Sequence, residues 1–187
     1  MYIPIILGSV RRNRRSVRVA RFVRSLLARR SALETELLDL AEFDFPVMVE
    51  RLRLRDDPPA GLQRFSDAIA KGDAVLVVTP EYNGGYPGAL KNALDYLLPE
   101  FRRKAVGIVT VSSGGFGGVN CLGQLRAVFL SMSAIPVPAK FPVSRVQNAF
   151  SADGTPEYET QVERANKFID DFLWFGEALR DRRARDE

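Results

Sequence analysis

Three uninterrupted apolar runs, each followed by a loop rich in glycine or polar residues, constrain the fold of this chain most strongly. They are residues 2–7, 74–79 and 105–111. Short apolar runs without polar alternation are typical of parallel strands that are buried on both faces of a sheet. Weaker strand patterns lie at 36–40 and within 135–146, so the sequence predicts five strands.

Helical patterns lie between these strands. Strands that alternate with helices predict an α/β fold in which a five-stranded parallel sheet carries helices on both faces. Ligands of such folds bind beyond the carboxyl ends of the strands, near the switch in strand order. We therefore expect the loops after the first, third and fourth strands to form one crevice. Apolar residues at helical spacing predict a helix at 16–29, and further helices are expected at about 60–71, 89–98, about 119–133 and 157–183.

The composition limits the chemistry that side chains can perform. The 187 residues suit one domain, 1–187, with a charged tail at about 180–187. No apolar run is long enough to span a membrane, so we expect a cytoplasmic protein. His is absent and Cys121 is the one cysteine, which leaves no histidine base, no internal disulfide and no expected metal site. We assign Cys121 to core packing, and any redox chemistry would need a bound cofactor.

The formal net charge of +4 admits two interpretations. Mild basicity suits ligands that carry phosphate groups. A nucleic-acid-binding regulator is the alternative, but it has no support beyond the charge. We expect neither a nucleic-acid partner nor a membrane partner.

The loop after the first strand, GSVRRNRRSV, has the features of an anion site. Backbone N–H groups and the helix dipole at the start of a helix attract an anion. Ser9 can donate a hydrogen bond, and Arg11 and Arg14 can each pair with a phosphate through two N–H groups. Ser16 is the expected N-cap of the helix. An ordinary capped helix with a solvated basic face is the alternative.

The loop after the third strand, PEYNGGYPG, can present backbone donors to a flat ring. Pro80 ends the strand because it has no N–H to donate to the sheet. Gly84 and Gly85 permit unusual backbone conformations and a close approach by a planar heterocycle, with Tyr82 nearby. A turn that only reverses the chain is the alternative.

The loop after the fourth strand, VSSGGFGG, has four glycines in the five positions that follow Ser113. So many glycines indicate close backbone approach to the edge of a ligand. The next helix begins without a strong cap, so we expect its first N–H groups to be free for a ligand. A flexible surface loop is the alternative.

Together these stretches resemble the NADPH-dependent FMN reductase family, which includes quinone, azo and chromate reductases. The matching segments are GSVRRNR, VARFV, PEYNGGYPGALKNALDYL and VSSGGFGGVNCLGQLRAVF, within residues 2–137. The resemblance implies a flavodoxin-like three-layer sandwich with strand order 2-1-3-4-5. It also implies FMN as cofactor, NADPH or NADH as co-substrate, and a ping-pong transfer of electron pairs to small acceptors such as quinones, azo compounds, metal oxyanions or free flavin.

The resemblance assigns roles to residues at matching positions. The phosphate of FMN would be held by Ser9, Arg11 and Arg14, with the backbone near Ser16 and Val17. The isoalloxazine ring would be lined by Pro80, Glu81, Tyr82 and Asn83, and its pyrimidine edge by Ser113, Gly114 and Gly115. No side chain is expected to be catalytic, because the flavin performs the hydride chemistry. A homodimer or homotetramer would form through the helix that contains Lys91, Asn92 and Asp95.

Arg12 and Arg15 either bind the 2′-phosphate of NADPH or belong to a solvated surface. Residues 46–60 give no indication of their role, and neither the acceptor nor the nicotinamide preference can be read. A flavodoxin-like carrier of single electrons, with no NADPH oxidation of its own, is the alternative function, although such carriers tend to be acidic.

Overall fold

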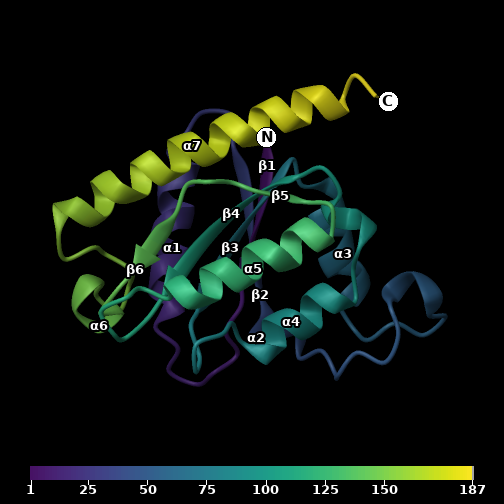
Figure 1. Ribbon diagram of the computed structural model, residues 1–187, viewed down its shortest axis with the longest axis horizontal. Helices are drawn as coiled ribbons and strands as arrows, with labels where there is room; N and C mark the ends of the chain where they lie inside the picture. The colour runs from purple at the N-terminus through teal and green to yellow at the C-terminus, as the bar shows by residue number, and fades with distance from the viewer. Residues whose placement is uncertain (187) are drawn as a thin grey trace.

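A parallel sheet forms the centre of the computed structural model, which describes residues 1–186 (Figure 1). Its main strands lie in the order β2-β1-β3-β4-β5, and every pair is parallel. This confirms the predicted flavodoxin-like order. The strands are β1 (Tyr2–Leu7), β2 (Glu34–Asp39), β3 (Ala74–Pro80), β4 (Ala105–Val111), β5 (Ile135–Pro136) and β6 (Phe141–Val143).

The last predicted strand, within 135–146, is divided into two short strands, β5 and β6, which both pair with β4. Between them, residues 137–140 lie opposite only residues 107–108 of β4. Pro138 in this excess segment has no N–H to donate to a ladder, and its carbonyl instead accepts a hydrogen bond from Arg126 at 2.8 Å. The expected five strands are therefore six, because the proline-marked segment cannot pair along its whole length.

Helices cover both faces of the sheet (Figure 1). The core on one face includes residues of α1 and α7, and the core on the other includes residues of α3, α4 and α5. Strand β1 contributes to both, because Ile5 lies in the first core and Ile6 in the second. The helices are α1 (Ser16–Ala28), α2 (Leu40–Phe43), α3 (Leu62–Lys71), α4 (Gly88–Asp95), α5 (Val119–Ser131), α6 (Val146–Ala149) and α7 (Glu159–Arg183), with 3-10 turns η1 (Leu52–Leu54) and η2 (Pro99–Phe101).

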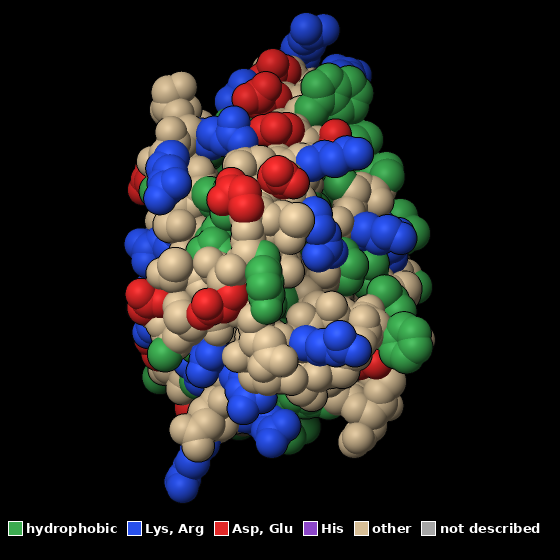
Figure 2. Space-filling view, turned by 90° about the vertical axis from the view of Figure 1, so that its left-hand side faces the viewer, with side chains coloured by type: hydrophobic (Ala, Val, Ile, Leu, Met, Phe, Trp, Pro, Cys, Tyr) green, Lys and Arg blue, Asp and Glu red, His purple; other side chains and the backbone are tan. Residues whose placement is uncertain are grey.

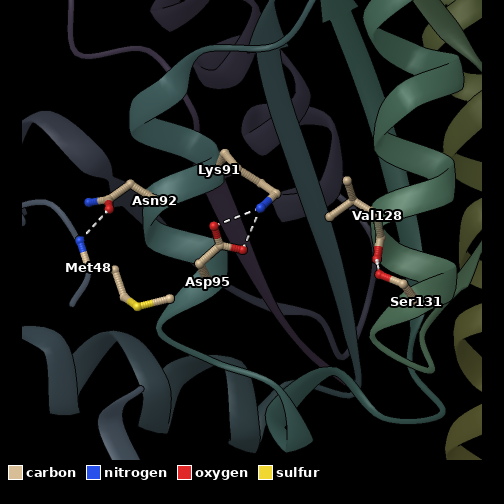
Figure 3. Close-up of polar contacts among 6 residues, drawn as sticks. All are labelled: Met48, Lys91, Asn92, Asp95, Val128 and Ser131. Carbon is tan, nitrogen blue, oxygen red and sulfur yellow. Dashed lines mark hydrogen bonds and ion pairs between the residues drawn. The ribbon is translucent and has the colours of Figure 1, made fainter. Parts of the chain in front are cut away.

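The long connection between α2 and α3 is held against α4 by Asn92 (Figure 3). The Oδ1 atom of Asn92 accepts a hydrogen bond from the backbone N of Met48 at 2.8 Å. On the side of α4 that faces α5, the Nζ atom of Lys91 pairs with Asp95 at 2.7 Å. Asn92 therefore stabilises its own chain, and the subunit contact predicted at this helix stays a prediction.

The charged tail is helical as far as Arg183, which donates hydrogen bonds to the carbonyls of Arg103 and Asp73. The last residue of the predicted tail, 187, lies outside the described residues. Within residues 1–186 no helix is both long and apolar enough to cross a membrane. The cytoplasmic location stays a prediction.

Candidate functional site

The three loops predicted to converge do meet in one cavity of about 440 Å³ at the carboxyl edge of the sheet. Loops that follow neighbouring parallel strands reach the same edge, and the switch in strand order between β1 and β3 opens a crevice there. The residues that line the cavity are Ser9, Arg11, Arg12, Asn13, Arg14, Arg15, Ser16, Pro80, Glu81, Tyr82, Val111, Ser112, Ser113 and Val146.

A contact between Ser9 and Tyr82 joins the first loop to the second. The Oγ atom of Ser9, which is fully buried, lies 2.6 Å from the hydroxyl of Tyr82. The guanidinium of Arg11 lies over the Tyr82 ring, 5.3 Å from its centroid. The first and second loops are therefore held together by Ser9, Arg11 and Tyr82, which the sequence predicted to bind the cofactor.

The start of α1 leaves buried donors without a partner. Arg14 forms an ion pair with Asp39 at the end of β2, but its Nε atom is buried and has no hydrogen-bond partner among the described residues. The Oγ atom of Ser16 is likewise buried and unpartnered. Buried polar groups without partners are rare and costly in folded proteins. Because both residues line the cavity, these atoms are suited to binding an anion there.

Ser16 is not the N-cap that the sequence predicted. Helix α1 begins at Ser16, and Arg15 occupies the N-cap position without a side-chain hydrogen bond. A serine inside the first turn has no cap bond of its own to make, and its hydroxyl is left for a ligand. Asn13 in the preceding turn has a φ of 55°, in the left-handed region that asparagine tolerates.

The second loop contains a tight hairpin turn. Tyr82 and Gly85 exchange backbone hydrogen bonds of 2.8 and 3.0 Å. Asn83 and Gly84 between them have φ angles of 52° and 79°, the pattern of a type I′ turn, which favours Asn-Gly. Asn83 is exposed at the tip of this turn and does not line the cavity, whereas Pro80 and Tyr82 do.

Glu81 caps the helix that follows the third loop. Its carboxylate accepts hydrogen bonds from the backbone N of Asn120 at 3.0 Å and of Cys121 at 3.2 Å, and from Asn120 Nδ2 at 3.1 Å. The expectation that α5 begins with free N–H groups is therefore wrong. A carboxylate from another loop satisfies two of them, at Asn120 and Cys121, and complements the helix dipole. Glu81 thus lines the cavity while fixing the second loop to α5.

The third loop has an ordered base and an open tip. Ser112 Oγ donates a hydrogen bond to the carbonyl of Gly114 at 3.0 Å and accepts one from the N of Gly117 at 3.1 Å. A Cβ at Gly117 would lie 2.8 Å from Pro142, whereas one at Gly114 would meet nothing within 4 Å. Close packing accounts for the glycine at 117, whereas the open space at Gly114 fits the predicted approach of a ligand.

Some predicted residues lie outside the cavity lining, and some lining residues were not predicted. Val17, Asn83, Gly114 and Gly115 do not line the cavity, so their roles stay predictions. Sequence reasoning missed Asp39 as the partner of Arg14, although an acidic residue at the carboxyl end of a strand could have signalled it. Lining residues for which no role was proposed are Asn13, Val111, Ser112 and Val146.

The thiol of Cys121 is buried at the start of α5. Burial, with a smaller contribution from Glu81, raises the pKa of the Cys121 thiol to about 12. Cys121 is therefore protonated at neutral pH, which agrees with its assignment to core packing. Among residues 1–186 no group of three or more His, Cys, Asp or Glu side chains could hold a metal ion.

The cavity fits FMN, the cofactor that the family resemblance implies. Its phosphate end would meet two buried unpartnered donors, Arg14 Nε and Ser16 Oγ, together with the first N–H groups of α1. A flat ring would find Tyr82 and Pro80 on the lining and open space at Gly84, where a Cβ would meet nothing within 4 Å.

Comparisons with known proteins agree with an FMN site in this cavity. A family model described as NADPH-dependent FMN reductase matches residues 1–148. An NAD(P)H-dependent FMN reductase of Schizosaccharomyces pombe is 36% identical over 147 residues, which cover 72% of this chain and 69% of that protein. A quinone reductase of Pseudomonas putida is 34% identical over 146 residues, or 74% and 76% of the two chains. The structure of the flavoenzyme NAD(P)H:(acceptor) oxidoreductase from Paracoccus denitrificans matches with a TM-score of 0.79 and 28% identity, over 95% of this chain and 97% of that one.

Proposed function

Since the chain belongs to the NADPH-dependent FMN reductase family, it is an oxidoreductase that uses FMN and NAD(P)H, and we propose that it passes electron pairs from NADPH to small acceptors in a ping-pong cycle. FMN, when bound by these loops, would supply the redox chemistry, namely acceptance of a hydride from a nicotinamide and return of an electron pair to an acceptor. The observation that carries the proposal is the cavity that all three loops share.

The first loop would bind the cofactor through its phosphate. Ser16 and Arg14 offer the buried donors, and the N-terminus of α1 adds backbone N–H groups. Ser9 and Arg11 reach the same cavity, but both also contact Tyr82. The phosphate site and the ring site would therefore be positioned relative to each other before any ligand binds.

The second and third loops would orient the ring and the molecules that react with it. Pro80 and Tyr82 would lie against the ring, and Ser113 would meet its edge. The Glu81 carboxylate holds the second loop to α5, which limits movement of the ring site. No side-chain base is required for hydride transfer, and the chain contains no histidine to provide one.

Nicotinamide and acceptor would use the same opening in turn, which agrees with a ping-pong cycle. Because the three loops line a single cavity that contains the ring site, the oxidised nicotinamide would leave before an acceptor enters. Quinones, azo compounds, metal oxyanions and free flavin are the acceptor classes that such an open site would take.

A spectrum of the FMN-loaded protein under anaerobic conditions tests this function. Addition of NADPH should bleach the visible band of oxidised flavin within the mixing time, and addition of a quinone should restore it. A flavin band that neither NADPH nor NADH bleaches would contradict the proposal and favour the single-electron carrier. Failure of the protein to bind FMN at all would contradict both functions.

We also propose that the protein is a homodimer or homotetramer with α4 at the contact. The connection held by Asn92 exposes three large apolar side chains, Val47, Val49 and Leu54, of which Val47 is 83% exposed. Large apolar side chains exposed on one segment suit a surface that a second copy of the chain covers. Light scattering tests this proposal, since a monomeric mass at micromolar concentration would contradict it.

A further inference from the structure

Arginine side chains dominate the charge of the cofactor cavity. Four arginines line it, at positions 11, 12, 14 and 15, and the one acidic residue among the lining residues is Glu81. The Glu81 carboxylate is already bonded to the first turn of α5. In Figure 2 the Asp and Glu side chains are most numerous in the upper half of the face shown, while Lys and Arg side chains also gather near its lower end, where the first loop lies in Figure 1.

The four arginines fall into two pairs with different surroundings. Arg14 is partly buried and paired with Asp39, and Arg11 lies over the ring of Tyr82. Arg12 and Arg15 are exposed, and neither guanidinium makes a hydrogen bond, ion pair or ring contact with the residues that the structure describes. Two arginines thus contribute to the loop structure, and two remain available to an anion that enters the cavity.

We infer that Arg12 and Arg15 bind the 2′-phosphate of NADPH and give the protein its preference for NADPH over NADH. This inference rests on the proposed function, because it names the residues that select the co-substrate. The 2′-phosphate is the one chemical difference between the two nicotinamides, and arginine is well suited to phosphate because it can pair through two N–H groups.

The burial of the two sets of donors supports the division of roles. Unpartnered donors at Ser16 and Arg14 are buried, where hydrogen bonds to a charged group are strongest, as suits a cofactor that stays bound. Arg12 and Arg15 are exposed, where a phosphate contact is weaker and exchanges readily. A co-substrate that must leave in every cycle requires contacts of this second kind.

Steady-state kinetics of the FMN-loaded protein test the inference. The variants are Arg12→Gln, Arg15→Gln and the double variant. The matched control is Arg24→Gln, which removes another exposed arginine of α1 that does not line the cavity. We expect each single variant to raise KM for NADPH roughly three- to tenfold, and the double variant to raise it more, at unchanged KM for NADH. Equal changes for both nicotinamides, or no change, would overturn the inference.

Direct binding gives a readout that does not depend on turnover. Calorimetric titration of the FMN-loaded protein with adenosine 2′,5′-bisphosphate should show binding that is at least about tenfold tighter than that of adenosine 5′-monophosphate. The double variant should lose this difference, and Arg24→Gln should keep it. Equal binding of the two nucleotides to the unmodified protein would overturn the inference. If the protein oxidised neither nicotinamide, the proposed function would fail, and the nucleotide titration would still decide whether these arginines recognise a 2′-phosphate.

Discussion

The two edges of the sheet differ in how completely their buried polar groups are paired. At the carboxyl edge, three buried side-chain atoms have no hydrogen-bond partner among the described residues: Arg14 Nε, Ser16 Oγ and Thr110 Oγ1. At the amino edge, the corresponding groups are paired with one another. Folded proteins satisfy nearly all buried polar groups, and the exceptions mark places where a ligand or water completes the structure. The carboxyl edge is therefore organised for binding and the amino edge for stability.

Asp73 shows how the amino edge is paired. Its Oδ2 atom accepts a hydrogen bond from the backbone N of Tyr2 at 2.8 Å, and its carbonyl accepts one from Arg183 at 2.7 Å. The hydroxyl of Tyr2 donates to Glu36 at 2.6 Å, and Arg64 pairs with the same carboxylate at 2.9 Å. These bonds connect β1, β2, α3, α7 and the residue that precedes β3 before any ligand binds.

The largest expected effect is on FMN affinity, which a substitution at the carboxyl edge should lower and a substitution at the amino edge should leave unchanged. Arg14→Gln removes a charged donor from the cavity and should raise the FMN dissociation constant on the order of 100-fold. It should also lower stability, because the buried Asp39 carboxylate loses its partner. Quenching of flavin fluorescence measures the affinity.

Asp73→Asn at the opposite edge is the matched control for Arg14→Gln. It should lower the free energy of unfolding by roughly 1 kcal/mol, because a hydrogen bond to a charged group becomes a weaker neutral one. FMN affinity should not change. A loss of FMN affinity similar to that of Arg14→Gln would show that the two edges are not independent.

The next largest effect is on the pH dependence of stability, to which the buried Lys104 at the amino edge should contribute. Its Nζ atom donates to the carbonyl of Ile69 at the end of α3, while burial, with a smaller contribution from Arg183, lowers its pKa to about 8. An unfolded lysine titrates near 10.5, so between these pH values the unfolded chain holds a proton that the folded chain has lost. Stability should therefore rise with pH in this window, at up to about 1.4 kcal/mol for each pH unit.

Chemical denaturation between pH 8 and pH 9.5 measures this dependence. The variant Lys104→Met should remove most of the rise, while Lys71→Met, at an exposed lysine, should leave it in place. An unchanged slope in Lys104→Met would assign the dependence to other groups. FMN affinity should be the same in both variants.

At Ser16 we expect a smaller effect, in which FMN affinity falls while the stability of the free protein does not. Ser16→Ala removes a donor that FMN would use, so the dissociation constant should rise roughly tenfold. The same change removes a buried unpartnered hydroxyl from the free protein, whose stability should stay equal or increase by about 1 kcal/mol.

Ser66→Ala is the matched control because Ser66 is also buried but donates to Glu100 at 2.9 Å. It should lower stability by about 1 kcal/mol and leave FMN affinity unchanged. If Ser16→Ala instead destabilised the free protein as much as Ser66→Ala, its hydroxyl would already have a partner.

The smallest expected effect is at Cys121, which lies near the cavity but is buried. Because its pKa is raised to about 12, the thiol should not react with a thiol reagent such as DTNB at neutral pH in the folded protein, with or without FMN. Full labelling should follow denaturation. Rapid labelling of the folded protein would mean that the third loop opens far enough to expose α5.

The sequence predicted the sheet well because its buried strands are uninterrupted apolar runs. β1 and β4 have the predicted bounds, and the order of the strands agrees with the family resemblance. The last strand was predicted poorly, because proline-marked residues 135–146 pair with β4 in two separate pieces. Local patterns identify strands, but they do not show where a ladder is interrupted.

Within the site, the sequence indicated which loops would meet but not how their side chains would pair. The cap that Glu81 provides to α5 joins positions about 40 residues apart, and the ion pair of Arg14 with Asp39 joins separate strands and loops. Such pairings depend on tertiary geometry, which periodicity and composition do not contain. The same limit explains why Ser16 was expected to cap α1 and instead lies inside its first turn.

Titration of the FMN-free protein with FMN and with riboflavin tests the central claim most directly, because the two ligands differ only in the phosphate. If the buried donors at the start of α1 bind that phosphate, FMN should bind at least about 100-fold more tightly than riboflavin. Ser16→Ala should reduce that ratio, whereas Ser66→Ala should preserve it. Equal affinity for FMN and riboflavin would contradict the claim that the unpartnered groups of the carboxyl edge form a phosphate site.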